Sequence, residues 1–184
     1  MHDIRPARAT YADVLAAPPN RVAELFDGVL YVSPYLWPRP SHANSSLLWR
    51  LGQSFDLGGD KSWRILRMPE IHLGEDVIVP DICGWLRSRM PVIPDTDWFE
   101  TAPDWACEVL TPSTRLLDQV IKREVYARHG VAHLWHLDPE ARVLEVFELT
   151  EGKWLVWQTF TGDDEVAAPP FAAMPFTLSD LWAD

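Results

Sequence analysis

The chain has 184 residues, of which 47% are hydrophobic and 23% are charged. This length predicts a single domain over residues 1–184, and the composition is that of a globular rather than a disordered protein. The net charge of −11 is uneven, because residues 137–184 carry ten acidic against two basic residues. This balance argues against a tight, non-specific DNA binder, but not against a metalloenzyme with acidic ligands.

Cysteine usage and the N-terminus point to the cytoplasm. Cys83 and Cys107 lie in hydrophobic runs without metal-ligand spacing, which is typical of buried, inert thiols in a reducing compartment. The first residues show no basic start with an apolar stretch, and no apolar run approaches the roughly 18 residues of a membrane span. We therefore expect a cytoplasmic protein that has no membrane partner. Ten tryptophans are many for this length and favour a homodimer that buries some of them.

The first half of the chain is expected to form two helices, one hairpin and two further strands. Thr10 is a candidate helix cap, and Asp27-Gly28 between apolar runs indicates a tight hairpin turn. Apolar residues with helical spacing precede Gly58-Gly59, a typical helix end. The expected elements are a helix at 10–16, a hairpin at 24–33, a helix from 42 to 58, and strands at 64–73 and 77–86 joined by a turn at 74–76.

A strand, a helix and another strand follow a loop at 87–103. The continuous apolar run 105–110 indicates a strand that is buried on both faces. Thr111-Pro112-Ser113-Thr114 is typical of a helix start, and Gly130 of a helix end. The expected elements are a strand at 105–110, a helix at 115–129, a strand at 132–137, a hairpin at 142–149 and 153–159, and a short turn at 178–182. This order predicts an α/β fold with a central mixed β-sheet, flanking helices, and extra N- and C-terminal hairpins.

Asp81 and Glu108 are the strongest candidates for chemistry. They lie on separate predicted strands whose pairing would bring the two carboxylates to one end of the sheet. Mg²⁺ prefers carboxylate oxygens and keeps several water ligands, so two acidic side chains are enough ligands from the protein. Such a metal can polarise a phosphoryl oxygen and activate a water for phosphodiester hydrolysis. A carboxylate within the run 105–110 would be costly to bury unpaired, so Glu108 needs a metal or a cation.

Lys122 is the cation that would complete such a site. A compact site would carry lysine two residues after the glutamate, and here that position is Leu110. If the following helix folds back along its strand, eight residues at about 1.5 Å each return Lys122 about 12 Å towards Glu108. There the amine would steady the nucleophilic water and the charge that develops on phosphorus. The alternative is a routine helix-surface pair between Lys122 and Asp118.

The sequence around these residues resembles a family of bacterial proteins described as endonucleases, the Uma-type family of the PD-(D/E)XK phosphodiesterase superfamily. The resemblance spans nearly the whole chain. Two segments depart from the family pattern without touching the candidate ligands: His133-Leu134-Trp135 stands for Glu-Tyr-Trp, and Thr111-Pro112-Ser113 for Ser-Pro-Ser. The matching residues are Glu24-Leu25-Phe26-Asp27-Gly28, Ser33-Pro34, His42, Pro80-Asp81, Glu108-Val109-Leu110, Asp118, Lys122, Tyr126, Gly130-Val131 and Leu134-Trp135.

The resemblance implies a restriction-endonuclease-like core that cleaves DNA with Mg²⁺, for which Mn²⁺ would substitute. It makes Asp81 and Glu108 metal ligands, to which the carbonyl of Val109 can add, and Lys122 the displaced catalytic lysine. Four residues are candidates for supporting roles: Glu24, His42, Asp118 and Ser113. Their alternatives are a hairpin-surface acid for Glu24, a capping or loop histidine for His42, an orienting partner of Lys122 for Asp118, and a cap or turn residue for Ser113. Tyr126 is expected to be core packing.

A second function class remains open. The acidic charge and the tryptophans also fit a catalytically silent dimer that binds a protein or a nucleic acid on the same fold. Binding of Mn²⁺ that depends on Asp81 would distinguish the enzyme from this binding module.

Overall fold

The structure is a computed structural model, and it describes residues 8–183. Helices and strands alternate in the middle of the chain, and hairpins precede and follow them. In chain order the elements are α1 (Tyr11–Leu15), β1 (Arg21–Phe26), β2 (Val29–Pro34), α2 (Pro38–Leu51), η1 (Gly52–Asp56), β3 (Trp63–Arg67), β4 (Ile71–Leu73), β5 (Asp76–Ile78), β6 (Ile82–Leu86), β7 (Trp105–Val109), η2 (Leu117–Lys122), α3 (Arg123–Arg128), β8 (His133–Asp138), β9 (Val143–Thr150), β10 (Lys153–Thr161), β11 (Glu165–Val166), β12 (Phe176–Thr177) and η3 (Leu178–Leu181).

A six-stranded mixed sheet forms the centre, with the strand order β10-β9-β8-β7-β6-β3. Only β7 and β8 run parallel in it, because the helix between them carries the chain back across the sheet. All five residues of β7 are buried, as the apolar run predicts. The predicted mixed sheet is thus confirmed. The second predicted hairpin, β9 and β10, extends the central sheet and does not lie outside it, because β9 pairs with β8.

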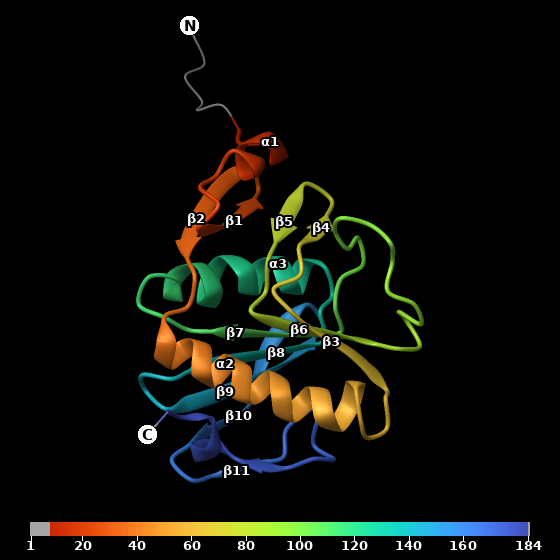
Figure 1. The fold of residues 1–184 in the computed structure, drawn as a ribbon, viewed down its shortest axis with the longest axis vertical. Helices are drawn as coiled ribbons and strands as arrows, with labels where there is room; N and C mark the ends of the chain where they lie inside the picture. Colours follow the sequence, from red (N-terminus) through yellow and green to blue (C-terminus); the bar gives the residue numbers. More distant parts are fainter. Residues whose placement is uncertain (1–7, 184) are drawn as a thin grey trace, which may run out of the picture.

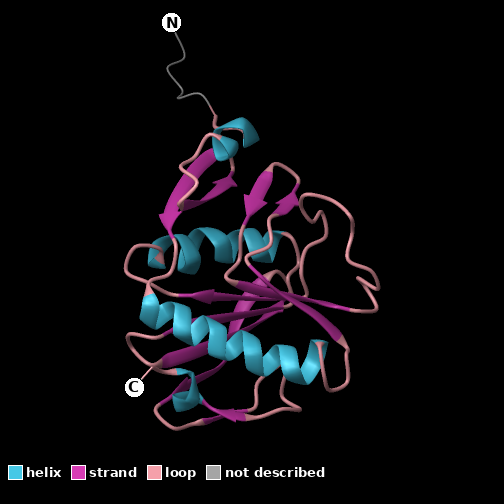
Figure 2. Cartoon of the chain, in the orientation of Figure 1, coloured by secondary structure: helices cyan, strands magenta, loops and turns pink. Residues whose placement is uncertain are grey.

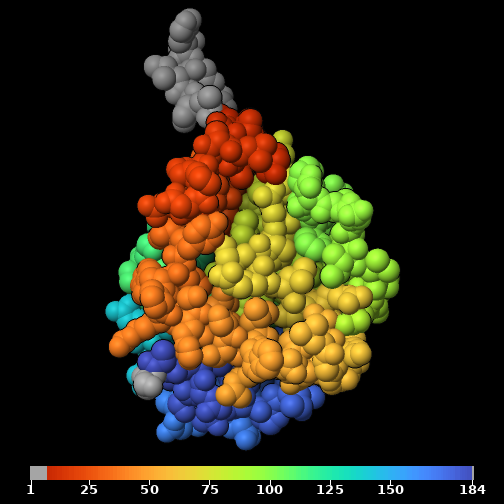
Figure 3. Space-filling view, viewed as in Figure 1, coloured from red at the N-terminus to blue at the C-terminus, as the bar shows by residue number. Residues whose placement is uncertain are grey.

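Helices cover both faces of the central sheet (Figures 1 and 2). The inward side of α2, including Leu47 and Leu51, packs with Trp105 and Trp135 in one core. Figure 3 shows the outer side of this helix, in orange, across the middle of the visible surface. On the opposite face, η2 and α3 pack onto the sheet through a second core that contains Tyr126.

The strands predicted at 64–73 and 77–86 are each broken in two, which corrects the expectation of two long paired strands. Their outer parts, β3 and β6, pair in the central sheet, while β4 and β5 pair with each other. β5 then joins the N-terminal hairpin β1–β2 in a separate four-stranded sheet. The breaks lie at Met68-Pro69, where Met68 has a φ of 49°, and at Pro80, and proline cannot donate to a sheet ladder.

Two helix starts follow from simple local chemistry. The α2 helix begins at Pro38, four residues before the predicted start at residue 42. A first-turn proline costs nothing there, since its missing N–H would have no partner within the helix. At α1, the Asp13 carboxylate accepts hydrogen bonds from the amide and the hydroxyl of Thr10. Thr10 therefore caps this helix, as predicted.

No helix between residues 8 and 183 combines the length and the apolar character needed to cross a bilayer.

Candidate active site

The three side chains singled out from the sequence converge on one face of the central sheet. Lys122 lies at the end of η2, and its Nζ is 2.9 Å from Oε1 of Glu108 on β7 and 3.1 Å from Oε1 of Glu24 on β1. Its distance to Asp118 is longer, 3.7 Å. The lysine side chain is 3% exposed and that of Glu108 is 1% exposed. A routine surface pair between Lys122 and Asp118 therefore does not describe this lysine.

Asp81 and Glu108 are held side by side by the pairing of β6 with β7. The amide of Val109 donates to Oδ2 of Asp81 at 2.8 Å, and the amide of Asp81 faces Oε2 of Glu108 at 3.3 Å. These reciprocal contacts arise because Ile82 is opposite Cys107 in the antiparallel ladder. The two carboxylates thus lie at one end of the sheet, as expected.

A widened turn of the helix after β7 brings the side chain of Lys122 back over that strand. Leu117–Lys122 forms a π-helical segment, which is uncommon and is frequent at functional sites. It places Asp118, Lys122 and Tyr126 along the side of the helix that faces Glu108. Gly130, with a φ of 70°, then ends the helix in the left-handed region, as predicted.

Charge in the cluster is unbalanced, because four carboxylates surround one ammonium group. Burial is the main cause that raises the pKa of Asp81 to about 7, and the charge of Glu108 adds to it. Burial likewise raises the pKa of Glu24 and of Asp118, although Lys122 opposes both shifts. For Lys122, burial favours the neutral form, but Glu108 and Glu24 outweigh it and hold the lysine pKa well above its usual range. Lys122 is therefore a charged group and not a proton acceptor at neutral pH.

A small cavity of about 30 Å³ opens beside the cluster, and its walls include Asp81, Glu108, Asp118 and Lys122. This volume exceeds the roughly 10–15 Å³ that a single water needs. Oε1 of Glu108 is occupied by Lys122 and Tyr126, and Oδ2 of Asp81 by the Val109 amide. Oε2 of Glu108 has only the long 3.3 Å contact with the Asp81 amide, and Oδ1 of Asp81 makes no hydrogen bond to residues 8–183. These two oxygens can therefore face a ligand, which matches a Mg²⁺ ion that keeps most of its waters. Within residues 8–183, no group of three or more His, Cys, Asp or Glu side chains is placed to hold a metal ion.

The four candidates for supporting roles separate into two pairs. Glu24 and Asp118 belong to the cluster, and Glu24 also accepts a hydrogen bond from the Val79 amide at 2.8 Å. His42 lies on α2, where its ring is 3.4 Å from the Ser46 hydroxyl, and Ser113 contacts Thr111 at 3.0 Å. Neither residue lines the cavity. Both cysteines are buried and unbridged, as expected.

Two contacts of the cluster escaped the sequence reasoning. The Tyr126 hydroxyl donates a short hydrogen bond to Oε1 of Glu108, so this residue does more than pack. The carbonyl of Val79 accepts from Lys122 at 3.3 Å. The spacing of Tyr126, four residues after Lys122 on one helix face, was the signal for the first contact. The second contact could not be predicted, because a pattern of side chains does not show where a backbone carbonyl will lie.

Comparison with known proteins identifies a family and similar solved structures. The family model "Uma2: Putative restriction endonuclease" matches residues 9–179. A crystal structure described as "a putative nuclease belonging to DUF820" from Anabaena variabilis ATCC 29413 is similar to this chain, with a TM-score of 0.75 and 23% sequence identity. The match covers 94% of this chain and 96% of that one, so the two share a fold. A search of curated proteins found no significant match.

Proposed function

The chain belongs to the Uma2 family, described as restriction endonucleases, and from this premise we propose that it is a metal-dependent endonuclease that hydrolyses DNA phosphodiester bonds. The observation that carries the proposal is the contact of Lys122 with Glu108, at 2.9 Å, beside Asp81 in a cavity with room for a small ion. The similar crystal structure is described as "a putative nuclease", which supports the same class.

Each residue of the cluster has a role in this proposal. Asp81 and Glu108 would hold Mg²⁺, or Mn²⁺ in its place, through Oδ1 of Asp81 and Oε2 of Glu108, of which the second has only a long contact with the Asp81 amide. When bound, the metal would supply Lewis acidity towards the phosphoryl oxygen and lower the pKa of the attacking water. Lys122 would orient that water and offset the negative charge that develops on phosphorus. Glu24 and Asp118 hold the ammonium group of Lys122 in position.

The test is cleavage of supercoiled plasmid and of single-stranded circular DNA in the presence of Mg²⁺ or Mn²⁺. Glu108→Gln and Lys122→Met should each slow cleavage by about 100-fold or more, because the first removes a proposed metal ligand and the second removes the cation that offsets the developing charge. Lys153→Met, on the exposed edge strand β10, is the matched control and should cut like the parent. If Glu108→Gln and Lys122→Met cut as fast as the parent, the site assignment is wrong.

A catalytically silent dimer is the second candidate, and one surface favours it. The edge strand β10 exposes Leu155, Val156 and Trp157, which are 55%, 58% and 43% accessible. An exposed apolar edge is a surface that a second copy of the chain can cover. Light scattering would establish the homodimer, and Leu155→Lys should dissociate it. Calorimetric titration with Mn²⁺ separates the two functions: binding that vanishes in Asp81→Asn favours the enzyme, and its absence favours the silent dimer.

A further inference from the structure

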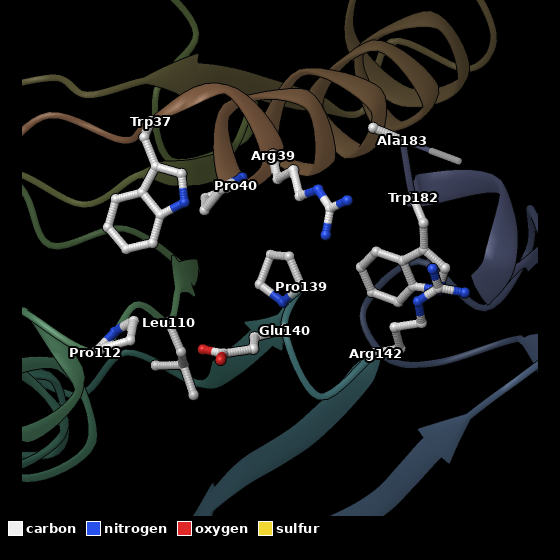
Figure 4. Close-up of a pocket in the computed structure, with 10 residues that line it drawn as sticks. All are labelled: Trp37, Arg39, Pro40, Leu110, Pro112, Pro139, Glu140, Arg142, Trp182 and Ala183. Carbon is white, nitrogen blue, oxygen red and sulfur yellow. The ribbon is translucent and has the colours of Figure 1, made fainter.

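A second and larger pocket lies beside the candidate active site, and Figure 4 shows the residues that line it. Its volume is about 350 Å³. The walls come from four separate segments: the start of α2, the chain after β7, the turn after β8, and the C-terminal residues 182–183. None of these residues belongs to the carboxylate cluster around Lys122.

The pocket and the small catalytic cavity are lined by residues that are neighbours in the chain. Tyr35 and Leu36 line that cavity, and the next residue, Trp37, lines the pocket. Glu108 lines the cavity, and Leu110, two residues further, lines the pocket. Two residues of extended chain span about 7 Å, which is close to the distance between successive phosphates of a nucleic-acid strand. A strand whose phosphate lies at Glu108 would thus bring a neighbouring nucleotide to this pocket.

The walls have the chemistry of a site for a flat, charged ligand. The indole rings of Trp37 and Trp182 lie on opposite sides of the opening, and the Arg39 side chain extends between them (Figure 4). An unpaired nucleobase stacks on such rings whatever its identity, and a guanidinium group binds the phosphate beside it. The carboxylate of Glu140 faces the same space and can accept from an exocyclic amino group.

Size selects among nucleic acids. A volume of about 350 Å³ is near the lower end of small-molecule pockets, which suits one nucleotide and not a double helix. A base that is already unpaired enters without the few kcal/mol that extrusion from a duplex requires.

We propose that the pocket between Trp37 and Trp182 binds one unpaired nucleotide of the strand to be cut, so that the protein prefers single-stranded or locally opened nucleic acid. The role of the pocket in cleavage rests on the proposed nuclease function, whereas binding itself does not require cleavage. Trp37 stacks the base, and Arg39 contacts its phosphate.

The experiment measures binding of a short 5′-fluorescein deoxyoligonucleotide by fluorescence anisotropy, with EDTA present so that nothing is cut. Trp37→Ala should weaken binding by about 5- to 100-fold, the range of one base–aromatic stack, and Trp37→Phe should restore most of it. The Trp37 side chain makes no capping hydrogen bond to α2, so its loss leaves the helix start intact. Trp49→Ala is the matched control, because Trp49 lies on the same helix, is 67% exposed and does not line the pocket.

Two further arms test the ligand class. Arg39→Gln should reduce the slope of log affinity against log salt by about 0.7, the value for one phosphate contact on a single strand. The same sequence as a blunt duplex should bind more weakly than the single strand. Equal binding by Trp37→Ala and the parent, tighter binding of the duplex, or no binding by the parent would each overturn the proposal. If the parent binds through Trp37 but never cleaves, the proposal for the pocket stands and the proposed nuclease function is wrong.

Discussion

At the scale of single residues, Tyr126 holds the central carboxylate. Its buried hydroxyl donates to Oε1 of Glu108, and a hydrogen bond to a charged group contributes about 1.5–3 kcal/mol. Tyr126→Phe should therefore lower the free energy of unfolding by about 2 kcal/mol in urea denaturation. Tyr31→Phe, whose ring packs on Phe26 from the N-terminal hairpin, should change it by less than about 0.5 kcal/mol. Equal effects of the two substitutions would show that Tyr126 contributes packing alone.

His136 makes the stability of the fold depend on pH. It lies on β8 opposite Glu108, and both of its ring nitrogens are buried without a hydrogen-bond partner among residues 8–183. Burial, together with the charges of Arg123 and Lys122, lowers its pKa to about 3. The unfolded chain takes up this proton near pH 6.5 and the folded chain only near pH 3, so stability is lost as the pH falls through this window.

The measurement is the free energy of unfolding of the parent and of His136→Leu between pH 7 and pH 4. As the pH falls, the free energy of unfolding of His136→Leu should rise relative to that of the parent by up to about 1.4 kcal/mol per pH unit. Trp49→Leu on α2 is the control, since Trp49 is exposed and carries no titratable group, so its curve should be parallel to that of the parent. A parallel curve for His136→Leu would contradict the assignment.

Residue chemistry and the family resemblance together predicted the centre of the cluster. A carboxylate in the apolar run of β7 needs a cation, and Lys122 on the next helix was the nearest one. Whether Glu24 belongs to the cluster was undecided from the sequence, because an acidic residue in a hairpin is equally plausible on the surface. Only the pairing of β1 with β5 turns its side chain inward. His42 stays apart from the cluster, since the early start of α2 places it on an exposed turn.

At the scale of elements, periodicity located the strands but not where they bend. Apolar residues continue through Pro69 and Pro80, so the two broken strands read as continuous. The breaks become favourable only in the fold, where β4 and β5 can leave the central sheet and pair beside β1. Such a choice between two sheets depends on distant partners, which a local pattern does not contain.

Two glycines provide a matched test of these local rules. Gly130 ends α3 with a φ of 70°, so Gly130→Ala should lower the free energy of unfolding by about 1 kcal/mol or more. Gly52 follows α2 with helical angles of −60° and −43°, and a methyl group there would meet no atom within 4 Å. Gly52→Ala should raise stability by up to about 1 kcal/mol, since helical glycine is less favourable than alanine. Thermal or urea unfolding should give opposite signs, and equal signs would refute the backbone explanation.

At the scale of the whole molecule, the central sheet with helices on both faces was predictable because strand and helix patterns alternate along the chain. The pocket between Trp37 and Trp182 was not. Its walls come from segments that are more than 140 residues apart at the extremes, from Trp37 to Trp182, and the sequence shows only two tryptophans and a proline-rich run. The approach of the C-terminal residues to the start of α2 is fixed by the core that packs beneath both.

Metal binding is the whole-molecule consequence of the unbalanced charge in the cluster. Four carboxylates, of which Glu24, Glu108 and Asp118 are buried and Asp81 is partly buried, oppose folding against one lysine, and a divalent cation that binds only the folded chain removes part of this cost. At about 100 times its dissociation constant, such a ligand adds about 2.7 kcal/mol, which corresponds to a rise in Tm of about 5–10 °C for a chain of this size. We expect Mn²⁺ to produce this rise in the parent and not in Asp81→Asn. The matched variant Asp163→Asn, on the exposed turn after β10, should respond like the parent. A shift of equal size in Asp81→Asn would place the ion elsewhere on this acidic surface, and the proposed ligands would then be wrong.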